Sequence, residues 1–415
     1  MKELLGKGWF DGSGISQKDF WTVFTLLFNT FTWFYMLLVI IDQVSISLNL
    51  EYSVRTIFYI AVTGSALAGS LIAEEVRRLR FLYSWMVFGI ASSFAFALVY
   101  SFAPSLTSIV SVPLGLSFGI GMPSCLAYLA DQTQTENRGL VSSLILLSSN
   151  LIAFPLALIF MTASVTLFSV ILVIWRVFGL LSFASMKPKE SFPLKGERRY
   201  VSFSSVLQNR QFTLYIIPWL MFSFVDRFEK IVFGNYIEPD FYRSLLSLGP
   251  MIGSLSILVT GLLCDKIGRK KVLIYGFILL GVAYALIGIA PTMGVSWYLY
   301  LALDSVAAGI LSLIFHFVIW GDLSQRHMRE KYYVVGSIPV FLTEAISLPL
   351  APYIKLIPAT SSFSLASFFL FTAVLPLIYA PETLPERKIQ MRQLRGYAEK
   401  AKKLREKYLK KNGAS

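Results

Sequence analysis

The stretch GLLCDKIGRKKVL (261–273) places a glycine, an acid and a basic cluster at the end of a hydrophobic run. Gly261 is followed eight residues later by Arg269, and the same interval separates Gly69 from Arg77 in the first half of the chain. The second copy lies 192 positions after the first (261 − 69). A recurrence at this distance predicts an internal duplication.

A second signature repeats at nearly the same offset. Asp131 is followed seven residues later by Arg138, and Asp322 is followed at the same interval by Arg329. The offset is 191 positions (322 − 131), so two separate landmarks repeat almost in register. Many secondary transporters are built from repeated halves, and the duplication therefore favours a transporter.

The composition is typical of a membrane protein. Mean hydropathy is +0.65 and only 15% of the residues are charged. Apolar runs of ~20 residues match a hydrocarbon layer of ~30 Å. We expect an all-α membrane protein with twelve transmembrane helices, at 20–41, 54–73, 81–102, 105–130, 139–160, 164–184, 212–236, 243–263, 272–291, 296–320, 333–354 and 361–380.

These spans divide the chain into two pseudo-symmetric bundles. We expect an N-terminal six-helix bundle at 1–185, a cytoplasmic linker at 186–211, a C-terminal six-helix bundle at 212–384 and a basic tail helix at 385–415. The tail is amphipathic, which is typical of a helix at a membrane surface. Binding of a specific partner is the alternative.

The Lys and Arg residues predict the orientation. Most of the 37 lie before the first span, in every second loop and after position 386. Cytoplasmic loops retain positive charge, so both termini are expected in the cytoplasm of a multi-pass protein of the cell membrane. The net charge of +13 then reflects topology and attraction to anionic lipids, and no nucleic acid partner is expected.

Known catalytic and cofactor motifs are missing from the sequence. Cys125 and Cys264 are too few for a disulfide framework or a thiolate metal site, so no metal is expected. The chain has no GxSxG elbow and no phosphate-binding GxxxxGK[ST] loop. We therefore expect no cofactor, no enzyme activity, and transport driven by gradients. The N-terminus lacks an apolar run of the kind found in a cleaved signal peptide.

Three motifs carry a family resemblance. The loop at 261–273, the segment DQTQTENRG (131–139) and the segment PETLPE (381–386) resemble signatures of the major facilitator superfamily. The last is similar to the ends of its sugar-porter and related metabolite-transporter branches. The resemblance implies a fold in which the first, fourth, seventh and tenth spans line a central cavity for a small-molecule substrate. A monomer is expected.

The repeated signatures suit a cytoplasmic gate. Gly261 and Gly268 allow close approach of neighbouring backbone, and Asp265 can face the positive N-terminal end of another helix. Arg269 can pair with Asp322, and by duplication Arg77 can pair with Asp131. The equivalent residues Arg138 and Arg329 complete the predicted gate. The alternative is that the basic loops only determine topology.

The first copy departs from the pattern. Ala73 stands where the second copy has Asp265, and Val76 replaces Gly268, so the two halves of the gate are expected to contribute unequally. The fourth span (105–130) contains no Lys or Arg, whereas many proton-driven exporters of the superfamily carry an arginine there. This argues against proton-driven drug export.

Charged residues inside spans are the best candidates for substrate or proton binding, because a charge at bilayer depth is costly. The seventh span carries Asp226, Arg227, Glu229 and Lys230. Asp226 and Lys230 share a helix face and can pair, Glu229 flanks that face, and Arg227 points away from it. The alternative is a salt bridge within the helix that only neutralises itself.

Two further candidates lie in later spans. Glu344 has no charged neighbour in the sequence and suits proton coupling; the alternative is a structural pair with Arg227 or Arg176. His316 can titrate, or it can simply hydrogen-bond a neighbouring helix. Arg176 is expected to extend toward the lipid headgroups.

Neutral polar groups in the membrane are weaker candidates. Asn29 in the first span and Asn150 in the fifth can hydrogen-bond a hydroxylated substrate or bridge two helices. Asp42 and Arg55 flank the first outer loop and are expected to pair there.

The leading hypothesis is a secondary transporter that moves a small polar metabolite (a sugar, an organic acid or a zwitterion) by alternating access, with protons as the coupling ion for symport. The alternative is an exporter of amphipathic or lipid-like compounds, which the Phe-rich spans favour. A third hypothesis is a sensor that signals through the basic tail.

Overall fold

The computed structural model describes residues 15–47, 53–103, 106–160, 164–190, 202–237 and 239–385. The expected tail helix lies outside these residues except for its first position, and so does 191–201 of the expected linker. All regular structure within the described residues is helical.

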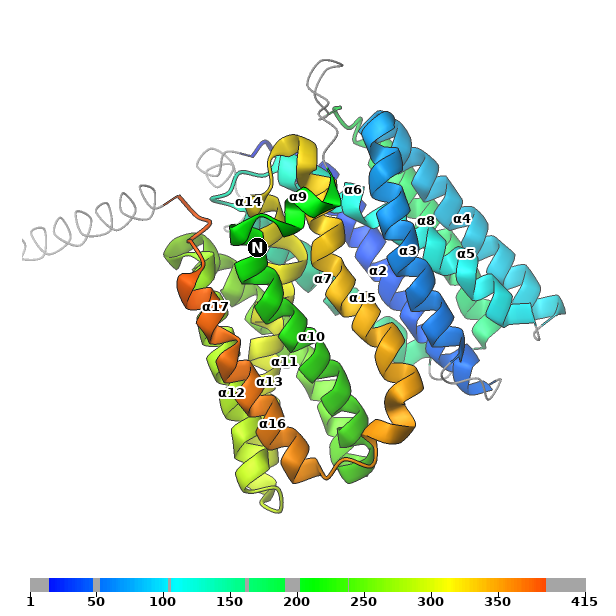
Figure 1. Ribbon diagram of the computed structural model, residues 1–415. Helices are drawn as coiled ribbons and strands as arrows, with labels where there is room; N and C mark the ends of the chain where they lie inside the picture. The colour runs from blue at the N-terminus through cyan, green and yellow to red at the C-terminus, as the bar shows by residue number, and fades with distance from the viewer. Residues whose placement is uncertain are drawn as a thin grey trace, which may run out of the picture.

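The helices of the first half pack side by side and form one group (Figure 1). They are α2 (Gln17–Ser47), α3 (Ser53–Glu75), α4 (Arg78–Phe102), α5 (Thr107–Gly119) with α6 (Met122–Gln132), α7 (Arg138–Phe160) and α8 (Val165–Ser185).

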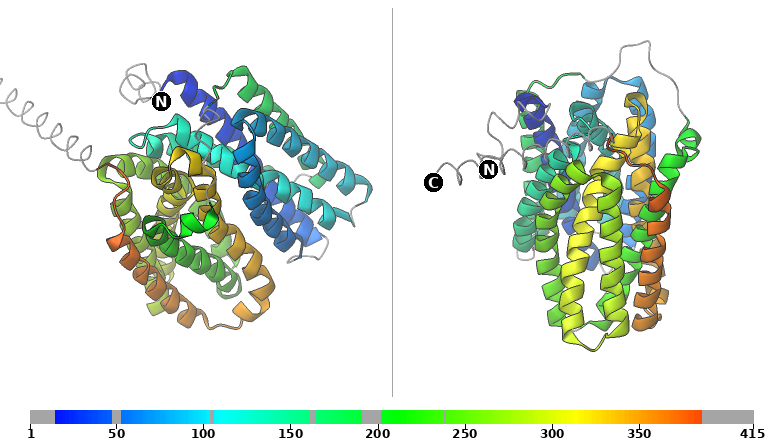
Figure 2. Two further views of the ribbon diagram at one scale, coloured as in Figure 1. Left: turned by 45° about the horizontal axis from the view of Figure 1, so that its top comes forward. Right: turned by 90° about the vertical axis from the view of Figure 1, so that its left-hand side faces the viewer.

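The helices of the second half form the other group, and Figure 2 (left) shows the two groups next to each other. They are α10 (Arg210–Tyr236), α11 (Pro239–Ile267), α12 (Arg269–Ile289), α13 (Gly294–Leu313) with the π-helix η2 (Ile314–Val318) and α14 (Ile319–Leu323), α15 (Arg329–Ile354), and α16 (Ala359–Thr372) with α17 (Val374–Tyr379). Short α9 (Phe203–Leu207) precedes α10, and a 3₁₀ turn, η3 (Arg326–Met328), precedes α15.

Twelve helical segments span the expected layer. Eleven of those in the described residues are long and apolar enough to cross a membrane. The twelfth is α10, whose 27 residues are also long enough but include a cluster of four charged side chains. The expected all-α fold with twelve transmembrane helices is confirmed.

The two groups meet along two helix pairs. Helix α3 packs against α15, and α7 packs against α11. By the 191-residue offset these are equivalent pairs, so the interface itself repeats the internal duplication. We call the two groups the N-terminal and C-terminal bundles.

The fourth and tenth spans both depart from a regular α-helix part-way along their length. The fourth breaks between α5 and α6, at Ile120 and Gly121. A Cβ on Gly121 would overlap the ring of Trp85, so glycine lets α4 approach closely at the break. The tenth span instead contains the π-helix η2, a form that recurs at functional sites.

Arg176 does not extend toward the headgroups. Its side chain is fully buried in α8, with the guanidinium 4.5 Å from the ring centre of Trp33 and 4.4 Å from that of Trp85. It also donates to the Asn29 Oδ1 (3.2 Å) and the Thr30 Oγ1 (3.1 Å). The expectation of snorkelling was wrong, because two rings and two hydrogen bonds stabilise the cation inside the N-terminal bundle. This clamp joins α2, α4 and α8.

Close packing in the N-terminal bundle gives a stability prediction. A Cβ on Gly69 would overlap the backbone of Ile120, whereas Gly64, one turn and a half earlier on α3, has open space around it. We expect Gly69→Ala to destabilise the protein by about 1–3 kcal/mol, the usual cost of overpacking.

Gly64→Ala is the matched control and should be neutral or slightly stabilising, because alanine favours a helix over glycine by about 0.5–1 kcal/mol. The measurement is the thermal midpoint of the purified protein in detergent. Equal midpoints for the two variants would contradict the close approach at Gly69.

Candidate functional site

The repeated motifs meet at one end of the molecule. The C-terminal ends of α6 and α14 and the first turns of α7, α12 and α15 lie together there, near α9 at the top of Figure 1. We call this the basic end. The loops there carry the Lys and Arg residues on which the predicted orientation depends.

Two ion pairs between the repeated signatures cross from one bundle to the other at the basic end. Arg138 at the start of α7 binds Asp322 at the end of α14. Reciprocally, Arg329 at the start of α15 binds Asp131 at the end of α6. Both aspartate side chains are fully buried. Because the pairs exchange under the 191-residue offset, we call them the crossed pairs.

Each aspartate is also held within its own bundle. The Arg269 Nε donates to the Asp322 Oδ2 at 2.9 Å, so the expected Arg269–Asp322 pair is confirmed. The expected Arg77–Asp131 pair was wrong: Arg78, one residue later, binds Asp131. Arg77 precedes the first turn of α4 and its side chain is exposed, whereas Arg78 begins the helix and is buried.

Asp265 caps a helix across the bundle interface. Its carboxylate accepts from the backbone N–H groups of Gly139 (3.0 Å) and Leu140 (2.7 Å), in the first turn of α7. An acid at a helix N-terminus is favoured by the helix dipole and by the unpaired N–H groups, as expected from the sequence. Gly261 also lies against α7, where a Cβ would overlap the Ser143 side chain.

The segment after α17 caps a further helix. Glu382 accepts from the backbone N–H groups of Arg269 (2.8 Å) and Lys270 (3.2 Å), at the start of α12. Gly268 lies directly before them with φ of 104°, a conformation that favours glycine. A Cβ there would also overlap the Glu382 carboxylate. The PETLPE segment thus contributes to the same end of the molecule as the loop motif.

The N-terminal half of the gate uses different contacts. Ala73 offers no cap to α15; instead Glu74 pairs with Lys331 at 2.6 Å. Glu330, which occupies the position equivalent to Gly139, binds Arg78. The two halves of the gate therefore differ, as expected. In the C-terminal half, Asp265 caps the backbone of α7, and in the N-terminal half two side-chain ion pairs take its place.

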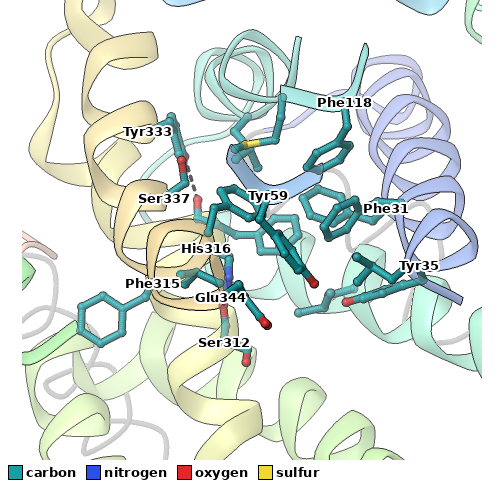
Figure 3. Close-up of a pocket in the computed structure, with 18 of the residues that line it drawn as sticks. Phe31, Tyr35, Tyr59, Phe118, Ser312, Phe315, His316, Tyr333, Ser337 and Glu344 are labelled. Carbon is teal, nitrogen blue, oxygen red and sulfur yellow. Dashed lines mark hydrogen bonds between the residues drawn. The ribbon is translucent and has the colours of Figure 1, made fainter. Parts of the chain in front are cut away.

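A cavity of about 220 Å³ lies between the bundles. Both bundles line it, mainly with aromatic side chains, six of which are Phe31, Tyr35, Tyr59, Phe118, Phe315 and Tyr333 (Figure 3). They come from the first, second, fourth, tenth and eleventh spans. The walls are therefore mostly rings, with a few hydroxyl groups at their edges.

One ion pair lies in the cavity wall. Arg227 from α10 binds Glu344 from α15. The Arg227 side chain is 24% exposed and the Glu344 side chain 6%, so the cation is the more accessible partner. Of the lining residues, all within the described part of the chain, these two are the acidic and basic ones apart from His316.

Comparisons with known proteins identify a family model and solved structures that this chain resembles. A model of the Major Facilitator Superfamily matches residues 209–414. The human organic anion transporter MFSD10 has the same fold over 87% of this chain and 99% of its own, with a TM-score of 0.68 and 15% identity.

The structural alignment with the E. coli fucose:proton symporter FucP covers 87% of this chain and 98% of FucP (TM-score 0.68, 10% identity). The proton:xylose symporter XylE covers 88% and 96% (TM-score 0.61, 14% identity). No curated protein matches the sequence. The chain belongs to the major facilitator superfamily.

As a member of this superfamily the chain is a multi-pass membrane transporter and not an enzyme. Likenesses at these identities show the fold alone, so the substrate and the coupling ion are not transferred from FucP, XylE or MFSD10. The superfamily match (209–414) includes the second copy of the gate motif, at 261–273. The first copy lies in the half of the chain that resembles the solved structures by fold.

The four charged side chains of the seventh span lie in different surroundings. Arg227 faces the cavity, while the Lys230 Nζ donates to the Asp226 Oδ2 at 2.7 Å within α10. Glu229 is buried and accepts from the Ser362 Oγ of α16 at 2.7 Å. The structure thus brings Arg227 together with Glu344, and leaves Asp226, Glu229 and Lys230 outside the cavity lining.

Of the other polar candidates, one lines the cavity and two bridge helices. His316 lines the cavity from η2, with its Nδ1 2.9 Å from the Ser312 carbonyl oxygen. Asn29 instead donates to the Trp175 carbonyl oxygen (2.7 Å), at the contact of α2 with α8. Asn150 donates to the Ser254 Oγ (3.1 Å), between α7 and α11. The two amides bridge helices and do not line the cavity.

Sequence reasoning missed part of both sites. Glu330 and Lys331 follow Arg329 directly and could have been found by comparing them with Gly139 and Leu140 of the first copy. The cavity rings had no comparable signal, because Phe and Tyr facing lipid and Phe and Tyr facing a cavity look alike in a sequence. The expected Asp42–Arg55 pair is confirmed at 3.0 Å.

The corrected arginine assignment gives a matched prediction. Arg78→Gln removes a cation that binds both Asp131 and Glu330, and should favour separation of the bundles at the basic end. Cys264 reports this opening, because its Sγ is buried against Gly139 of the other bundle. In a Cys125→Ser background we expect Arg78→Gln to raise the rate of thiol labelling at least ~10-fold, since breaking a buried pair costs about 3–5 kcal/mol.

Arg77→Gln is the control, and its labelling rate should match the parent. A size-exclusion profile and a thermal midpoint establish that the Arg78→Gln protein is folded during labelling. Equal rates for the two variants would overturn the assignment of Arg78 to the gate.

Proposed function

We propose that this transporter moves a small polar metabolite together with protons, by alternating access of the central cavity. The observation that carries the proposal is the Arg227–Glu344 pair in the cavity wall. Charged side chains at membrane depth are costly and are usually retained for binding or proton transfer. An Arg–Glu pair within reach of a ligand offers an anion site and a proton acceptor in one place.

The basic end supplies the gate for this mechanism. Both crossed pairs are buried, so the cavity is closed from that side. If the basic loops lie in the cytoplasm of a cell-membrane protein, as the positive-inside rule favours, this is the state closed to the cytoplasm. To open the basic end, Arg138 must leave Asp322 and Arg329 must leave Asp131.

The known proteins with this fold support the proposal in general terms. Two are named as proton symporters of sugars and one as an organic anion transporter. Each combines a similar two-bundle fold with a small-molecule substrate. We propose a monomer as the transporting unit, because one chain contains both bundles and the cavity between them.

The ring-lined cavity favours a second candidate, an exporter of amphipathic compounds. The two proposals differ in the direction of net substrate flux under a proton gradient. Symport predicts uptake when the outside is acidic, whereas proton-driven export predicts loss of substrate from the compartment into which the protons flow.

The test uses proteoliposomes with radiolabelled probes of three classes: L-lactate as an organic acid, D-xylose as a sugar and betaine as a zwitterion. An inward pH gradient should drive accumulation of at least one class by the wild-type protein. Glu344→Gln should abolish accumulation but retain exchange of labelled for unlabelled probe, because exchange does not require release of the proton.

Unchanged accumulation in Glu344→Gln would remove the proton role of this residue. Gradient-driven efflux with no uptake would favour the exporter.

A further inference from the structure

We infer that the ligand of the cavity is a monoanion with a flat apolar body, which displaces Glu344 from Arg227 while Glu344 binds one proton. This inference rests on the proposed function and narrows its substrate to organic acids and similar anions that carry a flat apolar body. It predicts electroneutral transport, because one negative charge and one proton move together.

The charges of the lining support this stoichiometry. When empty, the cavity holds one guanidinium and one carboxylate in contact, and its charge is balanced. A ligand carboxylate or sulfonate on Arg227 leaves a second negative charge beside it, in walls that are mainly apolar. Uptake of one proton by Glu344 restores the balance, whereas two anions on one guanidinium in apolar walls would repel each other.

The exposure of the two partners favours an anion over a cation. Arg227 is 24% exposed and Glu344 6% exposed, so an incoming group meets the guanidinium first. A guanidinium has five N–H donors, and can begin to bind a carboxylate or sulfonate before it releases Glu344. A ligand ammonium group would have to reach the more deeply buried carboxylate.

The rings of the cavity favour a flat apolar body. Phe34 and Phe118 of the N-terminal bundle stack with centroids 3.9 Å apart, and Phe341 of α15 lies edge-on to both at 6.2 Å. Phe31 contacts Phe317 of η2, again across the bundle interface, at 4.7 Å. A ring-shaped ligand can replace such contacts, and so bind both bundles at once.

Other titratable side chains share the cavity with the Arg227–Glu344 pair. Tyr59 of α3, Tyr35 of α2 and His316 of η2 line the same cavity. The hydroxyl groups of the two tyrosines lie on the side of the cavity where Glu344 projects (Figure 3).

Other charged side chains around Arg227 already have partners. Asp42 lies within electrostatic reach of Arg227 but pairs with Arg55 at 3.0 Å. Asp226, on the same helix as Arg227, pairs with Lys230 at 2.7 Å. Among these carboxylates, Glu344 is the one that loses its partner when a ligand occupies Arg227.

The first test is binding of benzenesulfonate, an anion that stays charged across the accessible pH range, to purified protein by calorimetry. Wild-type affinity should rise as pH falls, by up to about tenfold per pH unit, because binding is linked to one proton. Arg227→Gln should lose binding. Glu344→Gln should bind about tenfold or more tightly and independently of pH, because the competing carboxylate is gone.

Matched probes and a matched variant provide the controls. Methanesulfonate has the charge without the ring, and phenyltrimethylammonium has the ring with the opposite charge; both should bind at least tenfold more weakly. Lys355→Gln removes a positive charge at an exposed position after α15 and should bind like the wild type. Weaker binding in Glu344→Gln, or a wild-type affinity that does not change with pH, would overturn the inference.

Flux measurements separate this inference from the proposed function. In proteoliposomes with a trapped pH indicator, benzenesulfonate uptake should consume one external proton per anion, and a potassium diffusion potential should not change its rate. If benzenesulfonate binds as predicted but does not cross, the transport proposal fails and the ligand class stands. If D-xylose or betaine crosses and benzenesulfonate does not bind, the ligand class fails and transport stands.

Discussion

The crossed pairs Arg138–Asp322 and Arg329–Asp131 are the interaction on which the rest of the structure depends. They join the two bundles at the basic end, with both carboxylates removed from solvent. Removal of one partner from such a pair leaves an uncompensated buried charge and costs about 3–5 kcal/mol. The bundles therefore separate there only when both pairs break, along with the Arg78–Glu330 and Lys331–Glu74 pairs that also join them.

The duplication gives the gate its symmetry, and substitutions have made its halves unequal. On one side Asp265 caps α7, and the small Gly139 leaves room for its carboxylate. On the other, Glu330 occupies the Gly139 position and its carboxylate turns to Arg78 instead. Backbone capping is directional and short-ranged, whereas side-chain ion pairs adjust to movement. The two sides should therefore resist opening in different ways.

Much of the gate was predictable because its contacts are local or repeated. The Arg269–Asp322 pair follows from the spacing of the repeated signatures, and the capping role of Asp265 follows from the helix dipole. Arg77 was chosen in place of Arg78 because the eight-residue interval from Gly69 matches it to Arg269, whereas the 191-residue offset of the second signature matches Arg78 (269 − 78). One residue turns a side chain by about 100° on a helix. Arg176 was misjudged because depth along a span says nothing of the two tryptophans that contact it.

The cavity was less predictable for a different reason. The sequence concentrates charge in the seventh span, but the helix distributes those charges around its circumference, and only Arg227 faces the cavity. Its partner Glu344 is 117 positions away (344 − 227), so no local pattern connects them. Pairing with Arg227 was one of two alternatives for Glu344. The structure adds that this pair lines the cavity, which makes the structural and functional alternatives compatible.

The most direct measurement of the gate is the distance between the bundles at the basic end. Spin labels at Arg77 and Gln325, which are exposed on opposite bundles, allow double electron–electron resonance on the purified transporter. With both crossed pairs intact, one population at short distance is expected. The double variant Asp131→Asn, Asp322→Asn should shift the protein to a second population at longer distance. The same distance distribution in both proteins would contradict the conclusion that the crossed pairs hold this end closed.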